Sequence, residues 1–232
     1  ITPRTHEKGR TLRLSVRFFP IKEKIPNSDS KILLQNYYDY LFESTWNKHC
    51  ILFSNSKGEV EENIAHLKKI AAEKHLPANY LVHHANISPA LREFTEQKMR
   101  TAEQPVCTGA TVTLELGIDL GKLERIVQTG CPLTVSGLVQ RLGRTGRRGG
   151  VAEMRFAFRW DMSLPPQEFY KEINWDFVMC VSMILLYTRE RWIEPMYLPR
   201  LPYSLLYHQT MSWLSSQGSV KPPELARYIL TL

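Results

Sequence analysis

Short apolar runs alternate with amphipathic stretches between residues 12 and 158, and this alternation is the main structural signal in the chain. Short runs rich in apolar and β-branched residues predict strands, while apolar positions that recur every three to four residues predict helices. The predicted strands are Leu12–Phe19, Cys50–Ser54, Tyr80–His84, Pro105–Thr108, Arg125–Gly130 and Ala152–Phe158. The predicted helices are Asp29–Ser44, Glu59–Lys74, Pro89–Arg100 and Thr134–Leu142. This succession predicts an α/β fold, a mostly parallel sheet flanked by helices.

The composition changes after Trp160, where prolines punctuate aromatic and aliphatic stretches. We therefore predict one domain over residues 1–160 and a smaller helical region over residues 161–232. Its predicted helices are Asp176–Arg191, Tyr203–Ser216 and Pro223–Leu232. A glycine turn at Gly218 between the last two predicts a helix-turn-helix, the start of a winged-helix-like domain. The apolar stretch Phe177–Tyr187 is shorter than the roughly 20 residues that cross a bilayer, so we expect a buried helix.

Composition and charge narrow the class of partner. A chain of 232 residues with 43% hydrophobic content can bury a substantial core. The net charge of +7 favours polyanionic partners. The four cysteines are far apart in sequence, so neither a disulfide framework nor a metal site is predicted. No secretory leader precedes the first strand, and we expect a cytoplasmic protein without a membrane segment, cut from a longer chain.

The segment from Gln140 to Arg147 reads Gln-Arg-Leu-Gly-Arg-Thr-Gly-Arg and contains three evenly spaced arginines and two glycines. Guanidinium groups bind phosphate oxygens in a planar, bidentate geometry, and glycine lets the backbone approach a ligand closely. Arg-Gly runs also occur in flexible RNA-binding tails. The apolar residues on both sides, such as Leu138 and Phe156, instead predict a packed helix and strand. The segment therefore predicts a polyphosphate site at the end of an ordered helix.

This segment resembles the last conserved motif of the superfamily 2 helicases, Gln or His followed by Arg-x-Gly-Arg-x-Gly-Arg. The resemblance implies that Arg144 and Arg147 are arginine fingers, which neutralise charge developing on the γ-phosphoryl group of ATP. It also implies that Gln140 senses the nucleotide. For Arg141, earlier on the helix, a purely structural role stays open.

A second segment, from Ala110 to Gly121, contains the sequence Leu-Glu-Leu-Gly-Ile-Asp directly after a predicted strand. It resembles helicase motif V and is most similar to the large-helicase-related (Lhr-like) branch of superfamily 2. The resemblance implies that Thr111 holds a nucleic-acid phosphate, while Gly117 and Asp119 approach the ATP ribose. Taken alone, Asp119 and the glycines could equally be ordinary turn residues.

Two further segments end predicted strands. His83-His84 could suggest a metal site, but neighbouring residues of a strand point to opposite faces and no further ligand stands at metal-binding spacing. In Lhr-like proteins this strand end precedes a Ser and an Arg that run beside the nucleic-acid backbone, which implies that role for Ser88 and Arg92. Ser88 could also be a helix cap alone.

The segment Cys50–Lys57 is similar to helicase motif IV, a buried strand followed by a small polar turn. By this resemblance Ser54 and Asn55 contact backbone phosphates. The alternative is that Asn55 and Ser56 only cap the helix that follows.

The chain contains no Gly-x-x-x-x-Gly-Lys-Ser/Thr loop, the usual cradle for Mg-ATP. We expect ATP and Mg²⁺ to be bound mainly by a preceding RecA-like domain of the same polypeptide, with this chain as the second RecA-like domain. The resemblance implies an ATP-dependent helicase that acts on single-stranded or duplex nucleic acid, with DNA favoured over RNA, and whose isolated C-terminal half is inactive. The alternatives are half of a DEAD-box type RNA helicase and a non-catalytic nucleic-acid-binding module.

Overall fold

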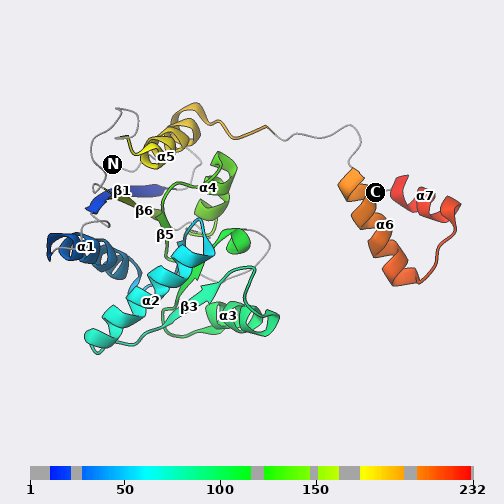
Figure 1. Cartoon of the computed structure of the whole chain (residues 1–232). Coiled ribbons are helices and arrows are strands. Elements are labelled where there is room, and N and C mark those ends of the chain that lie inside the picture. Colours follow the sequence, from blue (N-terminus) through cyan, green and yellow to red (C-terminus); the bar gives the residue numbers. More distant parts are fainter. Residues whose placement is uncertain are drawn as a thin grey trace. The chain divides into compact units, whose positions relative to one another are not determined.

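In a computed structural model, the described residues are 11–21, 28–115, 123–146, 151–161, 173–195 and 203–230. The chain divides into two compact units, Ile1–Ile193 and Glu194–Leu232. The first unit contains the sheet and its covering helices, and the described residues of the second are mainly helical (Figure 1). The first unit thus extends beyond the boundary expected after Trp160.

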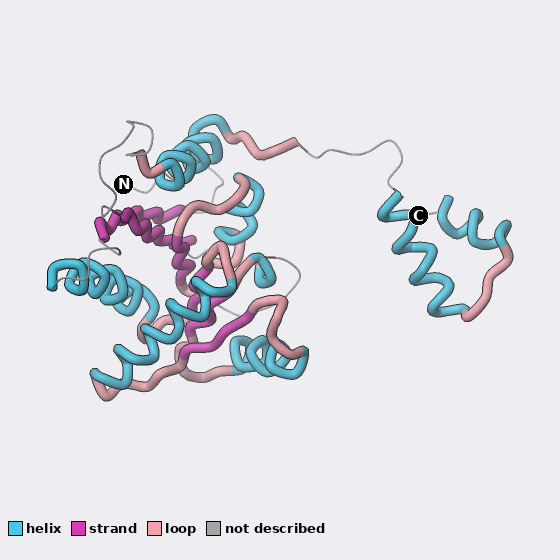
Figure 2. Tube along the Cα trace, viewed as in Figure 1, coloured by secondary structure: helices cyan, strands magenta, loops and turns pink. Residues whose placement is uncertain are grey.

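The first unit is built on a parallel sheet, coloured magenta in Figure 2. Its strands are β1 (Leu12–Ile21), β2 (Cys50–Phe53), β3 (Tyr80–His83), β4 (Cys107–Ala110), β5 (Arg125–Thr129) and β6 (Ala152–Asp161). They lie in the order β1-β6-β5-β2-β4-β3, and every described pair is parallel. The prediction of an α/β fold on a mostly parallel sheet is confirmed.

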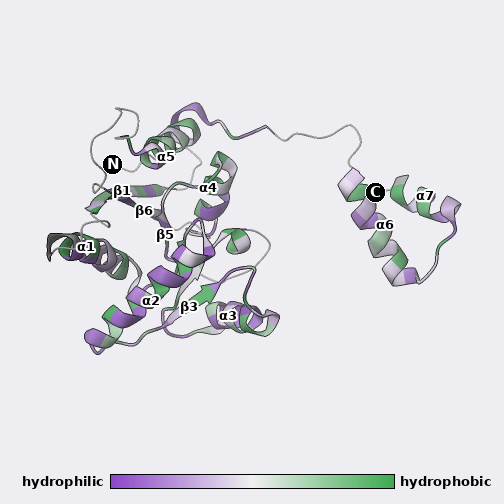
Figure 3. Cartoon of the chain, in the orientation of Figure 1, coloured by the Kyte–Doolittle hydropathy of each residue, from purple (hydrophilic) through white to green (hydrophobic). Residues whose placement is uncertain are grey.

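Helices connect the strands and cover both faces of the sheet. They are α1 (Ser28–Thr45), α2 (Lys57–Glu73), α3 (Pro89–Thr101), α4 (Val135–Leu142) and α5 (Trp175–Leu185), with the 3₁₀ turn η1 (Val112–Leu114) after β4. Four begin at a side-chain cap, because Ser56, Ser88, Thr134 and Asn174 accept the N–H of Glu59, Leu91, Gly137 and Phe177, respectively. In Figure 3, hydrophobic and hydrophilic residues alternate along α2, as expected of a helix with one buried side.

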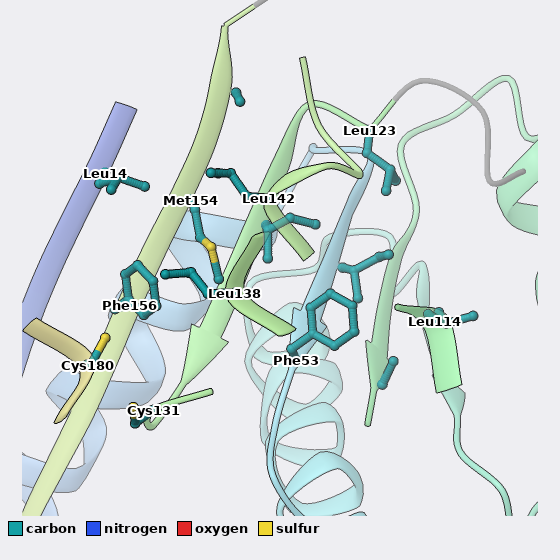
Figure 4. Close-up of a cluster of buried hydrophobic side chains, with 14 of the residues drawn as sticks. Leu14, Phe53, Leu114, Leu123, Cys131, Leu138, Leu142, Met154, Phe156 and Cys180 are labelled. Carbon is teal, nitrogen blue, oxygen red and sulfur yellow. The ribbon is translucent and has the colours of Figure 1, made fainter. Parts of the chain in front are cut away.

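Successive strand residues supply two separate cores. In β2, Ile51 and Phe53 point toward α4 and α5, whereas Leu52 points toward α1 and α2. Figure 4 shows the first core, in which Leu138 and Leu142 of α4 meet Phe53 and the strand residues of β6. This division fixes which face each helix covers, and hence where α4 presents its arginines.

Strand β4 begins and ends two residues later than the predicted Pro105–Thr108. The strand continues through Gly109, although glycine weakens strands. Glycine is required there because a Cβ on Gly109 would lie 2.6 Å from Cγ1 of Ile64, so α2 packs directly on the strand backbone.

The predicted buried helix over Asp176–Arg191 is only partly correct. Helix α5 ends at Leu185, a π-helical turn follows over Leu186–Glu190, and Arg191 takes a left-handed conformation with φ of 54°. Within α5 only Cys180 and Ile184 are buried, while Trp175 is 53% exposed. Because apolar residues occur on every side of this segment, the sequence did not indicate that only one side packs on the sheet.

The second unit consists of α6 (Tyr203–Gln217) and α7 (Pro222–Leu230). They are joined at Gly218, whose positive φ of 75° favours glycine, and Trp213 stacks on Tyr228 with ring centroids 3.9 Å apart. The prediction of two helices across a glycine turn is confirmed, and their membership of a winged-helix domain stays a prediction. In the part of the chain that is described, no helix combines the length and apolarity that crossing a membrane requires.

Candidate functional site

The carboxyl ends of β2, β4 and β3 lie side by side, because these three strands are adjacent and parallel. Asn55 follows β2, Thr111 follows β4, and Ser88 follows β3 at the start of α3. Ligands of open α/β sheets bind at this edge. The fold thus brings three of the residues expected to contact nucleic acid to one edge of the sheet.

Ser54 and Asn55 are adjacent but differ in exposure. Ser54 is 1% exposed, and its hydroxyl accepts from Nδ2 of Asn63 (3.2 Å) and lies 2.7 Å from Oγ1 of Thr129. Asn55 is exposed and donates to the carbonyl of Cys131 (2.8 Å). The cap of α2 is Ser56. In this conformation the buried Ser54 stabilises the end of β2, and its hydroxyl would not face a bound phosphate. The exposed Asn55 can be reached by one.

Ser88 and Arg92 lie on the first turn of α3. The exposed Ser88 caps the helix by accepting the N–H of Leu91 at 3.3 Å. Arg92 is half-buried, and its Nε has no hydrogen-bond partner among the described residues. Because a capped helix N-terminus and a guanidinium both favour anions, this turn is suited to a phosphate.

The histidine pair has structural partners. Nε2 of His83 lies 3.0 Å from a carboxylate oxygen of Glu96, and its Nδ1 lies 2.9 Å from Oγ1 of Thr113. Nε2 of His84 lies 3.0 Å from Glu61. His83 ends β3 and His84 follows it, and the two rings have separate partners. His83 thereby ties α3 and the Thr111 loop to the end of β3.

The Thr111 loop, which we define as residues 111–115, is compact. Thr111 is half-buried and stands before η1 without a side-chain cap bond. Leu114 is fully buried, and the N–H of Glu115 donates to the carbonyl of Val112 at 3.0 Å. The Thr111 side chain is thus held on a short closed turn.

Arg141 is a buried anchor. It is 1% exposed, and its Nε and Nη2 donate to the same carboxylate oxygen of Glu115 at 2.7 and 2.6 Å. Nη1 donates to the side-chain oxygen of Gln128. The guanidinium carbon also lies 4.8 Å from the ring centroid of Phe53. These contacts are structural, which is the role that the sequence left open for Arg141.

Arg144 follows the end of α4 and is half-buried. Its Nε donates to the backbone carbonyl of Glu115 at 3.0 Å, and its Nη2 donates to the same oxygen. Gln140 is half-buried near the end of the same helix. The other residues expected at the nucleotide, Gly117, Asp119 and Arg147, lie outside the described residues.

A carboxylate with a shifted pKa lies beside this edge. Burial raises the pKa of Glu59 above its usual value, although a hydrogen bond from Thr129 and the charge of Arg159 act in the opposite direction.

Sequence reasoning missed Glu115 and Gln128. Both bind Arg141, and Glu115 also accepts from Arg144. A signal was present for Glu115, a charged residue between Leu114 and Leu116, because an ionised group in an apolar run needs a buried partner.

Known proteins resemble this chain in sequence and in fold. The domain family described as helicase conserved C-terminal domain matches residues 31–149. The ATP-dependent helicase Lhr-Core of Methanocaldococcus jannaschii is 32% identical over 123 residues, which are 53% of this chain and 14% of that protein. The protein of the same name from Saccharolobus solfataricus is 26% identical over 189 residues, 81% of this chain and 20% of that protein. The chain thus spans a small part of these relatives.

A solved structure has the same fold. The structure of Mycobacterium smegmatis helicase Lhr bound to ssDNA and AMP-PNP superposes with a TM-score of 0.65 at 23% sequence identity, covering 87% of this chain and 25% of that one. The family match covers half of the chain and includes the strand-end loops and the arginine helix described above. The chain therefore belongs to the helicase conserved C-terminal domain family, in the Lhr-like branch of the superfamily 2 helicases.

Proposed function

We propose that this chain is the second motor domain of an ATP-dependent DNA translocase or helicase. A first RecA-like domain of the same polypeptide holds ATP and Mg²⁺, and this chain closes over the nucleotide with Arg144 and Arg147 as arginine fingers. Gln140, Gly117 and Asp119 contact the nucleotide. The strand-end loops hold the backbone of the nucleic acid through Thr111, Ser88, Arg92 and Asn55.

The observation that carries the proposal is the short link between the two groups of residues. Arg144 donates to the carbonyl of Glu115, the last residue of the Thr111 loop. The proposed phosphate contact and the proposed finger therefore belong to one connected unit. A motor needs such a connection, because nucleotide binding and release must change the grip on the strand.

The chemistry of Arg144 suits a polyphosphate. The carbonyl oxygen of Glu115 that accepts from Arg144 is neutral, whereas phosphate oxygens are charged and form stronger hydrogen bonds with guanidinium groups. A γ-phosphoryl group that enters this position would therefore compete effectively with the carbonyl. ATP with Mg²⁺ supplies the phosphoryl group, and Arg144 stabilises its negative charge.

DNA is proposed as the polymer. The solved helicase Lhr that shares this fold is bound to ssDNA. The proposed contacts are mainly to the sugar–phosphate backbone, so they do not depend on base sequence. The net positive charge of the chain also favours binding to the negatively charged nucleic-acid backbone.

ATP hydrolysis by the full-length protein that carries this chain tests the proposal. Rates are measured without polynucleotide, with single-stranded DNA and with single-stranded RNA, for the wild type and for Arg147→Ala. We expect stimulation by DNA that is lost in the variant. Lys68→Ala removes one exposed positive charge from α2 and serves as the control with wild-type rates.

Each other outcome has a defined meaning. Stimulation by RNA alone would reassign the protein to the RNA helicases. Rates that stay unchanged in Arg147→Ala would contradict the finger assignment. If no polynucleotide stimulates hydrolysis, the chain is a binding module.

A further inference from the structure

Glu115 contacts Arg141 of α4 and Arg144, which follows that helix, through two different groups. Its carboxylate accepts from Arg141, and its backbone carbonyl accepts from Arg144. The side chain and the main chain of one residue therefore fix two of the three arginines in the Gln140–Arg147 segment. A shift of Glu115 cannot leave Arg144 in place without breaking one of these bonds.

The carboxylate of Glu115 lies against the surface of α4. Gly137 and Arg141 are four residues apart and so lie on one side of the helix. A Cβ on Gly137 would lie 3.9 and 4.0 Å from the two carboxylate oxygens of Glu115, so the carboxylate covers the backbone of α4 at a residue without a side chain. Arg141 holds the carboxylate from the next turn of the helix, and its guanidinium carbon lies 4.8 Å from the ring centroid of Phe53.

The other end of the connection is equally constrained. Glu115 is bonded through its N–H to Val112 within the Thr111 loop. Thr113 donates to the carbonyl of His83 at 3.2 Å, which attaches the loop to the end of β3. Movement of Thr111 is therefore transmitted along a closed turn to Glu115 instead of being absorbed by a flexible loop.

We propose that Glu115 is a positioning residue that couples the nucleic-acid grip of the Thr111 loop to the placement of Arg144, with Arg141 as its buried anchor. This inference rests on the proposed function, since it describes how the two ends of that site communicate. Glu115 touches neither substrate. When a phosphate displaces the Thr111 loop, Glu115 moves with it, and the carbonyl that holds Arg144 moves as well.

The test compares Glu115→Gln with Glu153→Gln. Glu153 is a matched control, because its side chain is 14% exposed against 13% for Glu115 and it also pairs with a buried arginine, Arg125. In the full-length protein we expect Glu115→Gln to reduce the stimulation of ATP hydrolysis by single-stranded DNA about tenfold, and Glu153→Gln to keep wild-type stimulation. Equal stimulation in the two variants would overturn the inference.

A double variant separates coupling from folding. Glu115→Gln combined with Arg141→Met removes the buried charge together with its partner, a change that folded proteins tolerate. We expect its melting temperature to return toward the wild-type value while stimulation stays low. Recovery of stimulation together with stability would show that Glu115 acts only on folding, and would overturn the inference.

Hydrogen exchange of the 232-residue chain provides a readout that does not depend on ATP hydrolysis. We expect Glu115→Gln to accelerate exchange in residues 111–115 and in residues 140–146 together, whereas Glu153→Gln leaves both at wild-type rates. Acceleration in only one of the two segments would contradict the coupling. If the wild-type protein shows no stimulation by any polynucleotide, the proposed function fails, and this exchange experiment still decides whether the two segments are coupled.

Discussion

Strand β5 has a buried arginine–glutamate pair near each end, and the two pairs have different surroundings. At its amino end Arg125 donates to Glu153 at 2.9 Å and to the carbonyl of Ser44 at 2.8 Å. Near its carboxyl end Gln128 accepts from Arg141, which is paired with Glu115. The charges and the exposure of the two glutamates are nearly alike.

The difference lies in the backbone that carries each glutamate. Glu153 belongs to β6 and faces Arg13 of β1 in the sheet register, so its main chain is fixed by regular strand pairing. Glu115 stands in a loop, and its carbonyl accepts from Arg144. The first pair therefore joins regular elements, whereas the second joins a proposed ligand-binding loop to a proposed catalytic arginine.

The comparison shows that a buried ion pair does not by itself identify a functional site. What distinguishes the carboxyl-end pair is its position at the strand edge that binds ligands in α/β folds, together with a second arginine that binds the backbone carbonyl of Glu115. The following predictions separate the two ends.

The largest difference is expected between the second arginines of the two clusters. Arg144→Ala should lower kcat of ATP hydrolysis in the full-length protein about 10³-fold or more, the usual contribution of an arginine finger. Arg155→Ala removes the second arginine bound to Glu153 and should leave kcat within about twofold of the wild type, because it lies with the amino-end pair. Steady-state kinetics at saturating ATP and DNA measure both, and equal losses would remove the distinction.

Removing the glutamate charge should lower the stability of the chain equally at the two ends of β5. Glu115→Gln and Glu153→Gln each leave a buried guanidinium without its carboxylate, and each should lower the free energy of unfolding by about 3 kcal/mol. Denaturant unfolding of the chain measures this value. A loss below about 1 kcal/mol at either end would mean that water reaches the guanidinium there.

The pair of Arg125 and Glu153 should also make the free energy of unfolding depend on pH in the acid range. Burial acts to raise the pKa of Glu153, but the charges of and hydrogen bonds from Arg125 and Arg155 outweigh it and lower the pKa below the usual value. The ionised carboxylate therefore contributes stability above its unfolded-state pKa, which is lost as the pH falls through the lower folded-state pKa. Acid titration of the unfolding free energy should be flatter for Glu153→Gln than for the wild type, and identical slopes would contradict this assignment.

The smallest effect is expected for an exposed pair at the amino end. Lys48 and Glu124 lie 2.9 Å apart, but their side chains are 39% and 45% exposed. Solvent screens such pairs, so Lys48→Ala should change the free energy of unfolding by no more than about 0.5 kcal/mol. Denaturant unfolding in low and high salt checks this, and a loss as large as that of Glu153→Gln would mean that burial is not what separates these pairs.

The sequence predicted the elements better than their arrangement. Period-two and period-3.6 patterns are local, so strands such as Arg125–Thr129 and helices such as α2 could be found from neighbouring residues. The order of the strands depends on contacts between distant segments and was not predicted. Strand β4 was misplaced because Gly109 is selected by the packing of Ile64, a contact that no local pattern contains.

The segments of the candidate site could be located from the sequence, but the connections between them could not. The segments that hold Thr111, Arg92 and Arg144 were found by their resemblance to helicase motifs, and the roles of these residues stay predictions. The burial of Ser54 was not predicted, because a polar residue after a strand looks the same whether it points outward or bonds to Thr129. The double role of Glu115 was missed for a related reason, since its carbonyl contact involves no side chain of its own.

If Arg144 is an arginine finger, it acts on the transition state of ATP hydrolysis, and differential binding tests this role most directly. The measurement compares wild type and Arg144→Ala of the full-length protein, with single-stranded DNA, for their affinities toward a non-hydrolysable ATP analogue and toward ADP with aluminium fluoride. The account predicts that the variant binds the ATP analogue within about threefold of the wild type but binds the transition-state mimic at least about 10²-fold more weakly. Equal changes in both affinities would contradict it.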